Sequence, residues 1–249
     1  MSTAVPKADL HLHTRESDGL ASVAQLLDYV EHRTELDVIA VTDHEDARGG
    51  QLARELAARR GYRFEVVVGA EITTIHGHLL ALFIEDAPKS FRSVERTLEA
   101  IHAAGGLAIV PHPMSWLTRS ISERTIERIH SGNEPGITFD GVELANPSPA
   151  GRVTAARARR LNARWGLPET GSSDAHHLLH VGTGWTQFEG TGSAGVRDAM
   201  VAHKTTAAMT RYASPREVGV GRTALGLAWG YAATPRKMLR LARKPPLER

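Results

Sequence analysis

Short apolar segments alternate with helix-length stretches along most of this 249-residue chain, and this alternation limits the folds it can adopt. The apolar segments have the length and composition of buried strands. They span residues 8–13, 38–44, 64–73, 78–84, 107–112, 141–146 and 168–173. Strands separated by crossover helices form a mostly parallel sheet. We therefore expect an α/β fold, either a barrel or an open doubly wound sheet.

The stretches between most of these strands are predicted helices. They span residues 23–33, 51–60, 94–104, 123–130 and 153–165. Ser22 with Gln25 is a plausible capping box for the first helix. Gly105 and Gly106 form a suitable stop for the third.

The composition excludes several classes of chemistry. The chain has no cysteine, which removes disulfides, thiolate metal sites and cysteine nucleophiles. Any transition metal must therefore be held by nitrogen and oxygen ligands. We find no apolar run of membrane-spanning length, and residues 1–7 lack the apolar stretch of a signal peptide. We therefore expect a cytoplasmic protein without a transmembrane segment.

The balance of basic and acidic side chains differs between two parts of the chain. Residues 1–212 hold 22 basic and 26 acidic side chains, whereas residues 213–249 hold eight basic and two acidic ones. We predict one domain over 1–212, followed by a basic tail, 213–249, that is helical and partly packed on the domain. The alternative is that residues 236–244 form a basic amphipathic helix that contacts a membrane surface or nucleic acid.

Side chains of metal-ligand type stand at the ends of nearly all the predicted strands. His11 and His13 close the first strand, and residues two apart on a strand face the same side, so this pair could bind one ion. The carboxyl ends of parallel strands meet at one rim, where distant positions converge. The other candidates are Asp18, His44, Glu71, His78, His112, Asp174 and His176. Imidazole together with carboxylate suits zinc, manganese or iron.

The order of these motifs resembles the polymerase and histidinol phosphatase (PHP) superfamily over about residues 8–210. The matching motifs are Asp-Leu-His-Leu-His-Thr at 9–14, Ser-Asp-Gly at 17–19, Val-Thr-Asp-His at 41–44, Gly-Ala-Glu at 69–71, Gly-His-Leu-Leu at 77–80, Pro-His-Pro at 111–113 and Ser-Asp-Ala-His at 173–176. The resemblance implies a distorted (β/α)7 barrel of the PHP type with a trinuclear metal centre.

The resemblance also implies how the ligands divide among two to three divalent ions of manganese, iron or zinc. One ion would be held by His11, His13, Glu71 and Asp174, and a second by the bridging Glu71 with His78 and His112. The third would be held by Asp18, His44 and His176. His76 competes with His78 as a ligand, and we choose His78 because it directly opens the apolar strand at 79–84.

Small members of this superfamily are phosphatases and nucleases. The resemblance therefore implies a metal-dependent phosphoesterase that hydrolyses nucleotides, short oligonucleotides or other small phosphomonoesters through a metal-bridging hydroxide. Arg119 and Arg152 could each bind a phosphate bidentately, or they could be solvated surface residues. His177 could line the mouth of the site. The strands of Glu71 and His112 are too close in sequence for a long substrate cap, and no residue is identified as the general acid.

Two other readings remain. An amidohydrolase-type metal hydrolase also gathers histidines and an aspartate at barrel strand ends, but the early Ser-Asp-Gly and Thr-Asp-His motifs disfavour it. A catalytically inactive metal-binding module is the second alternative. It is disfavoured because all nine ligand positions are filled.

Overall fold

The computed structural model describes residues 5–132, 134–221, 223–226, 228–229 and 232. These residues form one mixed sheet with the strand order β7-β6-β5-β4-β3-β2-β1-β8-β9. The strands are β1 (Lys7–Leu12), β2 (Val38–Val41), β3 (Glu65–Thr74), β4 (Gly77–Leu82), β5 (Leu107–Val110), β6 (Gly141–Ala145), β7 (Glu169–Gly171), β8 (Gly184–Gln187) and β9 (Thr206–Met209).

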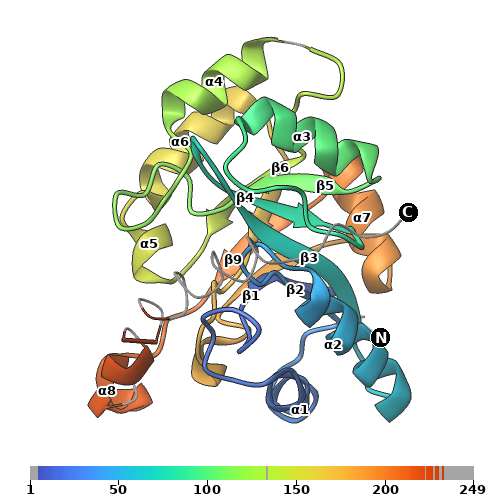
Figure 1. Ribbon diagram of the computed structural model, residues 1–249, viewed down its shortest axis with the longest axis vertical. Coiled ribbons are helices and arrows are strands. Elements are labelled where there is room, and N and C mark those ends of the chain that lie inside the picture. The colour runs from blue at the N-terminus through green and yellow to red at the C-terminus, as the bar shows by residue number, and fades with distance from the viewer. Residues whose placement is uncertain (1–4, 133, 222, 227, 230–231, 233–249) are drawn as a thin grey trace.

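The helices pack around this sheet (Figure 1). They are α1 (Val23–Arg33), α2 (Arg48–Arg60), α3 (Val94–Ala103), α4 (Glu123–Gly132), α5 (Pro149–Arg152), α6 (Ala155–Trp165), α7 (Gly192–Val201) and α8 (Pro215–Val218), with a short 3-10 turn, η1 (Leu178–His180). In Figure 1, α3, α4 and α6 gather at the top of the molecule, and α1 and α2 lie at the bottom.

Strands β1 to β7 curve into a nearly closed barrel, which confirms the predicted α/β barrel. Neighbouring strands in this series are parallel except β4, which is antiparallel to both β3 and β5 because a tight turn, and no crossover helix, joins it to β3. The barrel is nearly closed between β1 and β7, and we call this junction the seam. The segment that follows β7 bridges it. Leu12 forms a parallel bridge with Ala175, and the His13 amide donates to the Ala175 carbonyl oxygen at 3.1 Å.

Strands β8 and β9 and helix α7 are absent from the sequence prediction. β8 pairs antiparallel with β1 and β9 at the end of the barrel remote from the carboxyl ends of the parallel strands. Helix α7 begins Gly-Ser-Ala-Gly, in which the two glycines disfavour a helix, so its sequence gives a weak helical signal. Its position is set by burial, because Val196, Ala199 and Met200 pack into the core.

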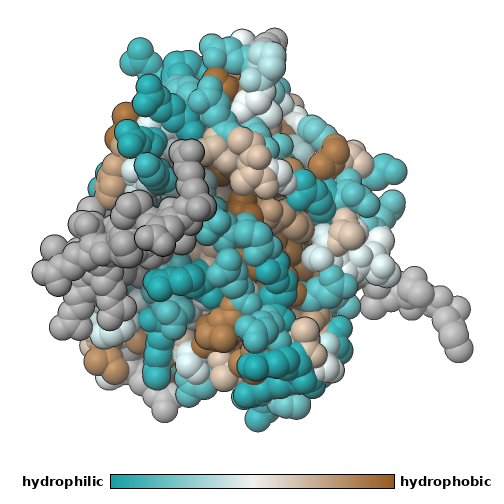
Figure 2. All heavy atoms as spheres, turned by 45° about the vertical axis from the view of Figure 1, so that its right-hand side comes forward, coloured by the Kyte–Doolittle hydropathy of each residue, from teal (hydrophilic) through white to brown (hydrophobic). Residues whose placement is uncertain are grey.

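The core consists of two layers outside the sheet and one apolar plug within it. Helices α1 and α2 cover β1 to β3, while α3, α4 and α6 cover β3 to β6. The plug combines inward residues of the strands, such as Leu10 and Leu80, with Phe188 and Met200. Hydrophilic residues cover most of the face in Figure 2, and hydrophobic residues gather in a strip near its middle. Because the plug occupies one end of the barrel, the polar strand ends are left to line the other.

The predicted cap of α1 is present. The Ser22 hydroxyl accepts from the Gln25 amide at 3.3 Å, and the Gln25 side chain accepts from the Ser22 amide at 3.0 Å. This capping box fixes the point at which the chain leaves the loop after β1 and enters the helix. It therefore also fixes one end of the loop that carries Asp18.

The predicted tail lies partly outside the described residues. Tyr212 stacks on His180 with ring centroids 3.6 Å apart, and α8 begins shortly afterwards. The predicted basic helix at 236–244 lies within 233–249, outside the part of the chain that the structure describes, so the boundary at residue 212 stays a prediction. Among the described residues, no helix is long and apolar enough to cross a membrane.

His102 gives the fold a pH-dependent contact. Its Nδ1 lies 2.8 Å from the Gly136 carbonyl oxygen and its Nε2 lies 2.8 Å from Oδ2 of Asp140, so the imidazole donates from both nitrogens when protonated. The hydrogen bond to Asp140 raises the pKa of His102 above its ordinary value, although burial opposes this.

A raised folded-state pKa stabilises the fold below the ordinary histidine pKa, and this stabilisation is lost as the pH rises through the folded-state value. We therefore expect His102→Gln to lower the free energy of unfolding more at about pH 6 than at about pH 9. Urea unfolding in the presence of a chelator measures both values. His130→Gln, at an exposed position on α4, is the control. An equal loss at both pH values would contradict the charged contact.

Candidate metal centre

All nine predicted ligand residues come together at the open end of the barrel. They come from seven different segments of the chain. His11, His13 and Asp18 lie on β1 and in the loop after it, His44 follows β2, Glu71 lies on β3, His78 on β4, His112 follows β5, and Asp174 and His176 follow β7.

A bulge in β1 orients the two histidines. The pairing of β1 with β2 shifts register between Asp9 and Leu12. As a result, Leu10 packs in the apolar plug, whereas Leu12 packs outside with residues of α1 and α2. A regular strand would place Leu10 and Leu12 on the same face. The irregularity therefore turns His11 and His13 towards the interior.

Glu71 lies at the centre of the cluster and its side chain is 2% exposed. Each of its two carboxylate oxygens faces a different group of histidines. Oε2 lies 3.4 Å from Nε2 of His11, 3.4 Å from Nε2 of His13 and 3.3 Å from Nδ1 of His44, and Oε1 lies 2.8 Å from Nδ1 of His78 and 3.2 Å from Nε2 of His112. One carboxylate thus faces imidazoles from four neighbouring strands or their ends.

The two aspartates extend the cluster on either side. Asp18 Oδ2 lies 3.4 Å from Nε2 of His44 and 3.3 Å from Nε2 of His176. Asp174 Oδ1 lies 3.5 Å from Nε2 of His11. Strand β7 ends at Gly171, so Asp174 and His176 lie beyond the strand, on the segment that closes the seam.

The donor set fits divalent metal ions. Four groups have ligand atoms within 4.8 Å of one another: His13, Asp18, His44 and His176; His11, His13 and Asp174; His11, Glu71 and His112; and His44, Glu71 and His78. Within the described residues, His11 Nε2, His13 Nε2, Asp18 Oδ1 and His78 Nδ1 are buried without a hydrogen-bond partner. His78 Nδ1 is close to Glu71 but is not aligned for a hydrogen bond. Buried polar atoms normally have partners, and metal coordination would satisfy these four.

The electrostatics keep the carboxylates ionised and one central imidazole neutral. Burial alone would raise the pKa of Glu71, but His78, His44 and His11 hold that pKa well below its ordinary value. Burial likewise opposes ionisation of Asp174, whose pKa His11 nonetheless lowers. Burial, reinforced by His176, lowers the pKa of His13 to about 3. Ionised carboxylate and neutral imidazole are the forms that bind metals.

Backbone strain coincides with the candidate ligands. His112 has φ 30° and Asp174 has φ 53°, in the left-handed region that side chains other than glycine rarely adopt. Such conformations cost on the order of 1–3 kcal/mol and persist where the surrounding structure fixes them. Here the strained backbone directs both side chains into the cluster.

Glu143 is a buried residue of this site that the sequence prediction missed. It lies on β6, where Val142 and Leu144 pack in the outer core and Glu143 faces the interior. Its Oε1 lies 3.2 Å from His11 Nδ1, and its Oε2 accepts from the His112 amide at 2.7 Å. The signal was present in the sequence as one acidic residue inside an otherwise apolar strand.

Asp43 and Ser120 were also missed, and both support candidate ligands. The buried Asp43 carboxylate accepts from the Thr14 amide at 2.8 Å and from the Ser17 hydroxyl, so it fixes the loop between His13 and Asp18. The Ser120 hydroxyl lies 2.8 Å from Nδ1 of His112. Partners of this kind orient the ligating nitrogen of a histidine.

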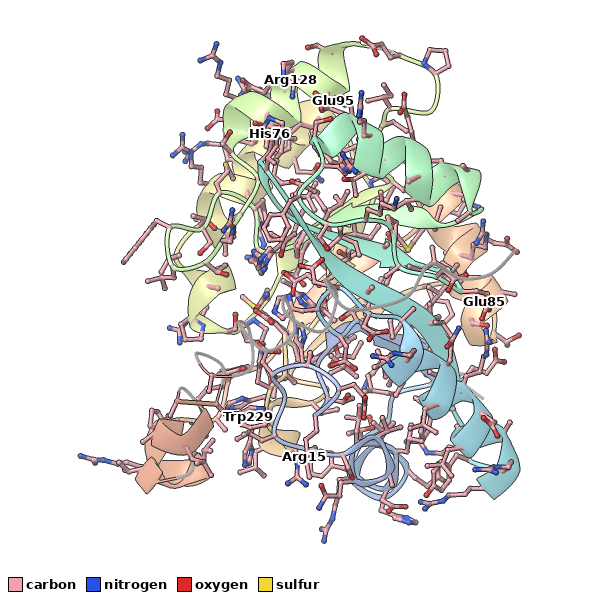
Figure 3. The ribbon with its side chains drawn as sticks, in the orientation of Figure 1. Arg15, His76, Glu85, Glu95, Arg128 and Trp229 are labelled. Carbon is pink, nitrogen blue, oxygen red and sulfur yellow. The ribbon has the colours of Figure 1, made fainter. Side chains whose placement is uncertain are left out.

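The structure separates the two competing histidines. His78 contacts Glu71, whereas His76 lies at the tip of the β3–β4 hairpin, near Glu95 and Arg128 in Figure 3. His76 Nδ1 accepts from the Val94 amide at 3.3 Å. It therefore faces the start of α3 and not the cluster.

The three predicted substrate residues lie in segments that surround the cluster. The Arg119 carbonyl oxygen accepts from the His78 amide at 2.9 Å. Arg152 ends α5, which begins after Ser148, and the Ser148 hydroxyl donates to Asp174 at 3.2 Å. His177 directly follows His176 and caps η1.

Comparison with known proteins gives matches to sequence and to fold. Residues 155–205 match the PHP-associated family model, PHP_C. An uncharacterised protein of Methanocaldococcus jannaschii is 36% identical over 152 residues, covering 56% of this chain and 81% of that protein. The 5'-3' exoribonuclease Rnm of Salmonella typhimurium is 30% identical over 170 residues, covering 65% of this chain but only half of its own length.

A solved structure shares the fold. A two-domain protein of Bacteroides vulgatus containing a predicted PHP-like metal-dependent phosphoesterase superposes with a TM-score of 0.67 at 22% identity. The match covers 83% of this chain and 65% of that one.

The position of Glu143 predicts a role in metal affinity. Glu143→Gln replaces one accepting oxygen by a donating NH2 group, so the side chain can no longer accept from both His11 and the His112 amide. We expect metal affinity to fall about 10- to 100-fold, as measured by titration calorimetry of the chelator-treated protein. Glu134→Gln, at an exposed loop position, is the matched control and should keep wild-type affinity. Unchanged affinity in Glu143→Gln would show that this contact does not orient a ligand.

Proposed function

The chain belongs to the polymerase and histidinol phosphatase superfamily, and we propose that it is a metal-dependent phosphoesterase acting on nucleotides, short oligonucleotides or other small phosphomonoesters. The observation that carries this proposal is the clustering of nine imidazole and carboxylate side chains, with the buried Glu71 at the centre. The exoribonuclease relative supports a phosphate ester of nucleic-acid type.

We assign the ligands to three sites. His11, His13, Glu71 and Asp174 form the first, Glu71 with His78 and His112 forms the second, and Asp18, His44 and His176 form the third. Each set contains side chains that approach one another, and Glu71 faces both of the first two. Around Glu71 the sets also adjoin, because His112 lies near His11 and His78 lies near His44. The nitrogen and oxygen donors suit manganese, iron or zinc.

Divalent ions bound by these residues would lower the pKa of bound water and neutralise charge on a phosphate ester. The protein supplies the rest. Glu71 and Asp174 provide the negative charge that holds cations close together, since their pKa values are lowered. Glu143 fixes the ring of His11, and the apolar plug excludes water from the closed end of the barrel.

Arg119 and Arg152 are proposed to hold the phosphate oxygens. Both are exposed, and neither side chain forms a hydrogen bond or ion pair with another residue in the described part of the chain. A planar guanidinium binds two phosphate oxygens at once. Arg119 and Arg152 could therefore bind the phosphate oxygens of a substrate whose phosphate also contacts metal ions in the cluster.

The ligand count predicts the metal content. We expect the purified protein to hold about two to three equivalents of manganese, iron or zinc per chain, because nine donors exceed the needs of one four-coordinate ion. Elemental analysis measures the content. Less than about half an equivalent, with no gain in phosphatase activity when manganese is added, would contradict the trinuclear assignment and favour an inactive module.

The shared carboxylates predict the effect of substitution. Glu71→Gln and Asp174→Asn should each reduce phosphate release by several orders of magnitude and leave the circular dichroism spectrum unchanged, because each removes charge that holds cations together. His32→Ala and His203→Ala, at exposed positions on α1 and after α7, should stay within a few-fold of wild type. If these controls lose as much activity, the site has been placed wrongly.

A further inference from the structure

Two loops flank the hairpin formed by β3 and β4, which carries Glu71 and His78. On one side, the Phe91 amide donates to the Thr73 carbonyl oxygen at 2.7 Å and the Ile75 amide donates to the Arg92 carbonyl oxygen at 3.0 Å. On the other side, the His78 amide donates to the Arg119 carbonyl oxygen. The backbone of both loops is therefore fixed to the hairpin of the candidate metal centre.

Each flanking loop exposes an aromatic ring. Trp116 is 76% exposed and Phe91 is 43% exposed. Ile75 at the hairpin tip and Leu117 beside the tryptophan are also exposed. Phe91 has φ 56°, a conformation that costs free energy for a residue with a side chain and is maintained here by the contact with Thr73. Exposed apolar side chains on adjoining segments mark an interaction surface, and these four lie on the hairpin tip and on the two loops bound to the hairpin.

Each aromatic residue has an arginine close to it in the sequence. Arg92 follows Phe91, and Arg119 lies three residues after Trp116. Among the described residues, neither arginine side chain has a hydrogen-bond or ion-pair partner, whereas Arg54 and Arg128 are paired with Glu85 and Glu95. Lys89 and Arg96 line a surface hollow next to Arg92 and are also exposed. The surface thus combines aromatic faces with positive charge.

This combination is the one that binds single-stranded nucleic acid, in which bases stack on aromatic faces and phosphates meet cations. A protein surface or a second copy of the chain would cover the apolar side chains but would not explain why Arg92 and Arg119 have no ion-pair partner among the described residues. We propose that Phe91 and Trp116, with Arg92 and Arg119, form a platform that stacks the bases of a single-stranded oligonucleotide whose reacting phosphate lies in the metal centre. This proposal rests on the proposed phosphoesterase function.

Base-dependent binding tests the platform without relying on turnover. Fluorescence anisotropy would compare a labelled, hydrolysis-resistant phosphorothioate pentanucleotide with an abasic strand of equal length on the metal-loaded protein. We expect the base-containing strand to bind at least about tenfold more tightly to the wild type, since stacking on one aromatic side chain changes affinity by roughly 5- to 150-fold. In Phe91→Ala/Trp116→Ala the preference should fall to about threefold or less, and Trp116→Phe should keep most of it.

Val201→Ala, at an exposed apolar position on α7, is the control and should keep the wild-type preference. Equal binding of both strands to the wild type, or a preference that survives the double substitution, would overturn the platform. So would a concentration-dependent dimer that disappears in Trp116→Ala, because it would assign the surface to self-association. Glycerol phosphate hydrolysis by the wild type with manganese tests the phosphoesterase separately, since that substrate has no ring to stack. Hydrolysis of glycerol phosphate together with equal binding of the base-containing and abasic strands would contradict the platform alone. Absence of hydrolysis of every phosphate ester would contradict the proposed function.

Discussion

The buried carboxylate of Glu71 is the interaction around which the polar end of the barrel is built. Its two oxygens lie within 3.4 Å of five imidazoles contributed by neighbouring strands. An isolated buried carboxylate is strongly unfavourable. The histidines offset this cost only if the strand ends stay in place, so the positions of β1, β2, β4 and β5 are tied to one charged group.

Much of this arrangement was predictable because most of the ligands stand at or shortly after the end of an apolar strand. The alternation of strands and helices predicted a mostly parallel α/β sheet, and the resemblance to the PHP superfamily implied that this sheet forms a barrel. The strand-end motifs predicted which side chains would meet. Other parts have no local signal. Strand β8 has only four residues with alternating burial, and α7 begins with a stretch that contains two glycines, so both form because the barrel buries them.

The site also contains features that local patterns do not predict. The bulge in β1 depends on pairing with β2, and the conformation of Asp174 depends on the segment that closes the seam. Glu143 was visible as an acidic residue in a buried strand, but its contact with His11 joins residues far apart in the chain. The contacts that support the ligands therefore depend on the closed barrel and not on the local sequence.

The seam of the barrel brings residues of the first strand and of the segment after β7 into the same cluster. His11 and His13 come from the first strand, and Asp174 and His176 come from the segment after the seventh. During synthesis the amino-terminal histidines therefore emerge long before their aspartate and histidine neighbours. Closing so long a loop has an entropic cost, and contacts between distant parts of a chain form slowly. Ions bound across the seam would offset part of that cost, because their ligands come from both sides of it.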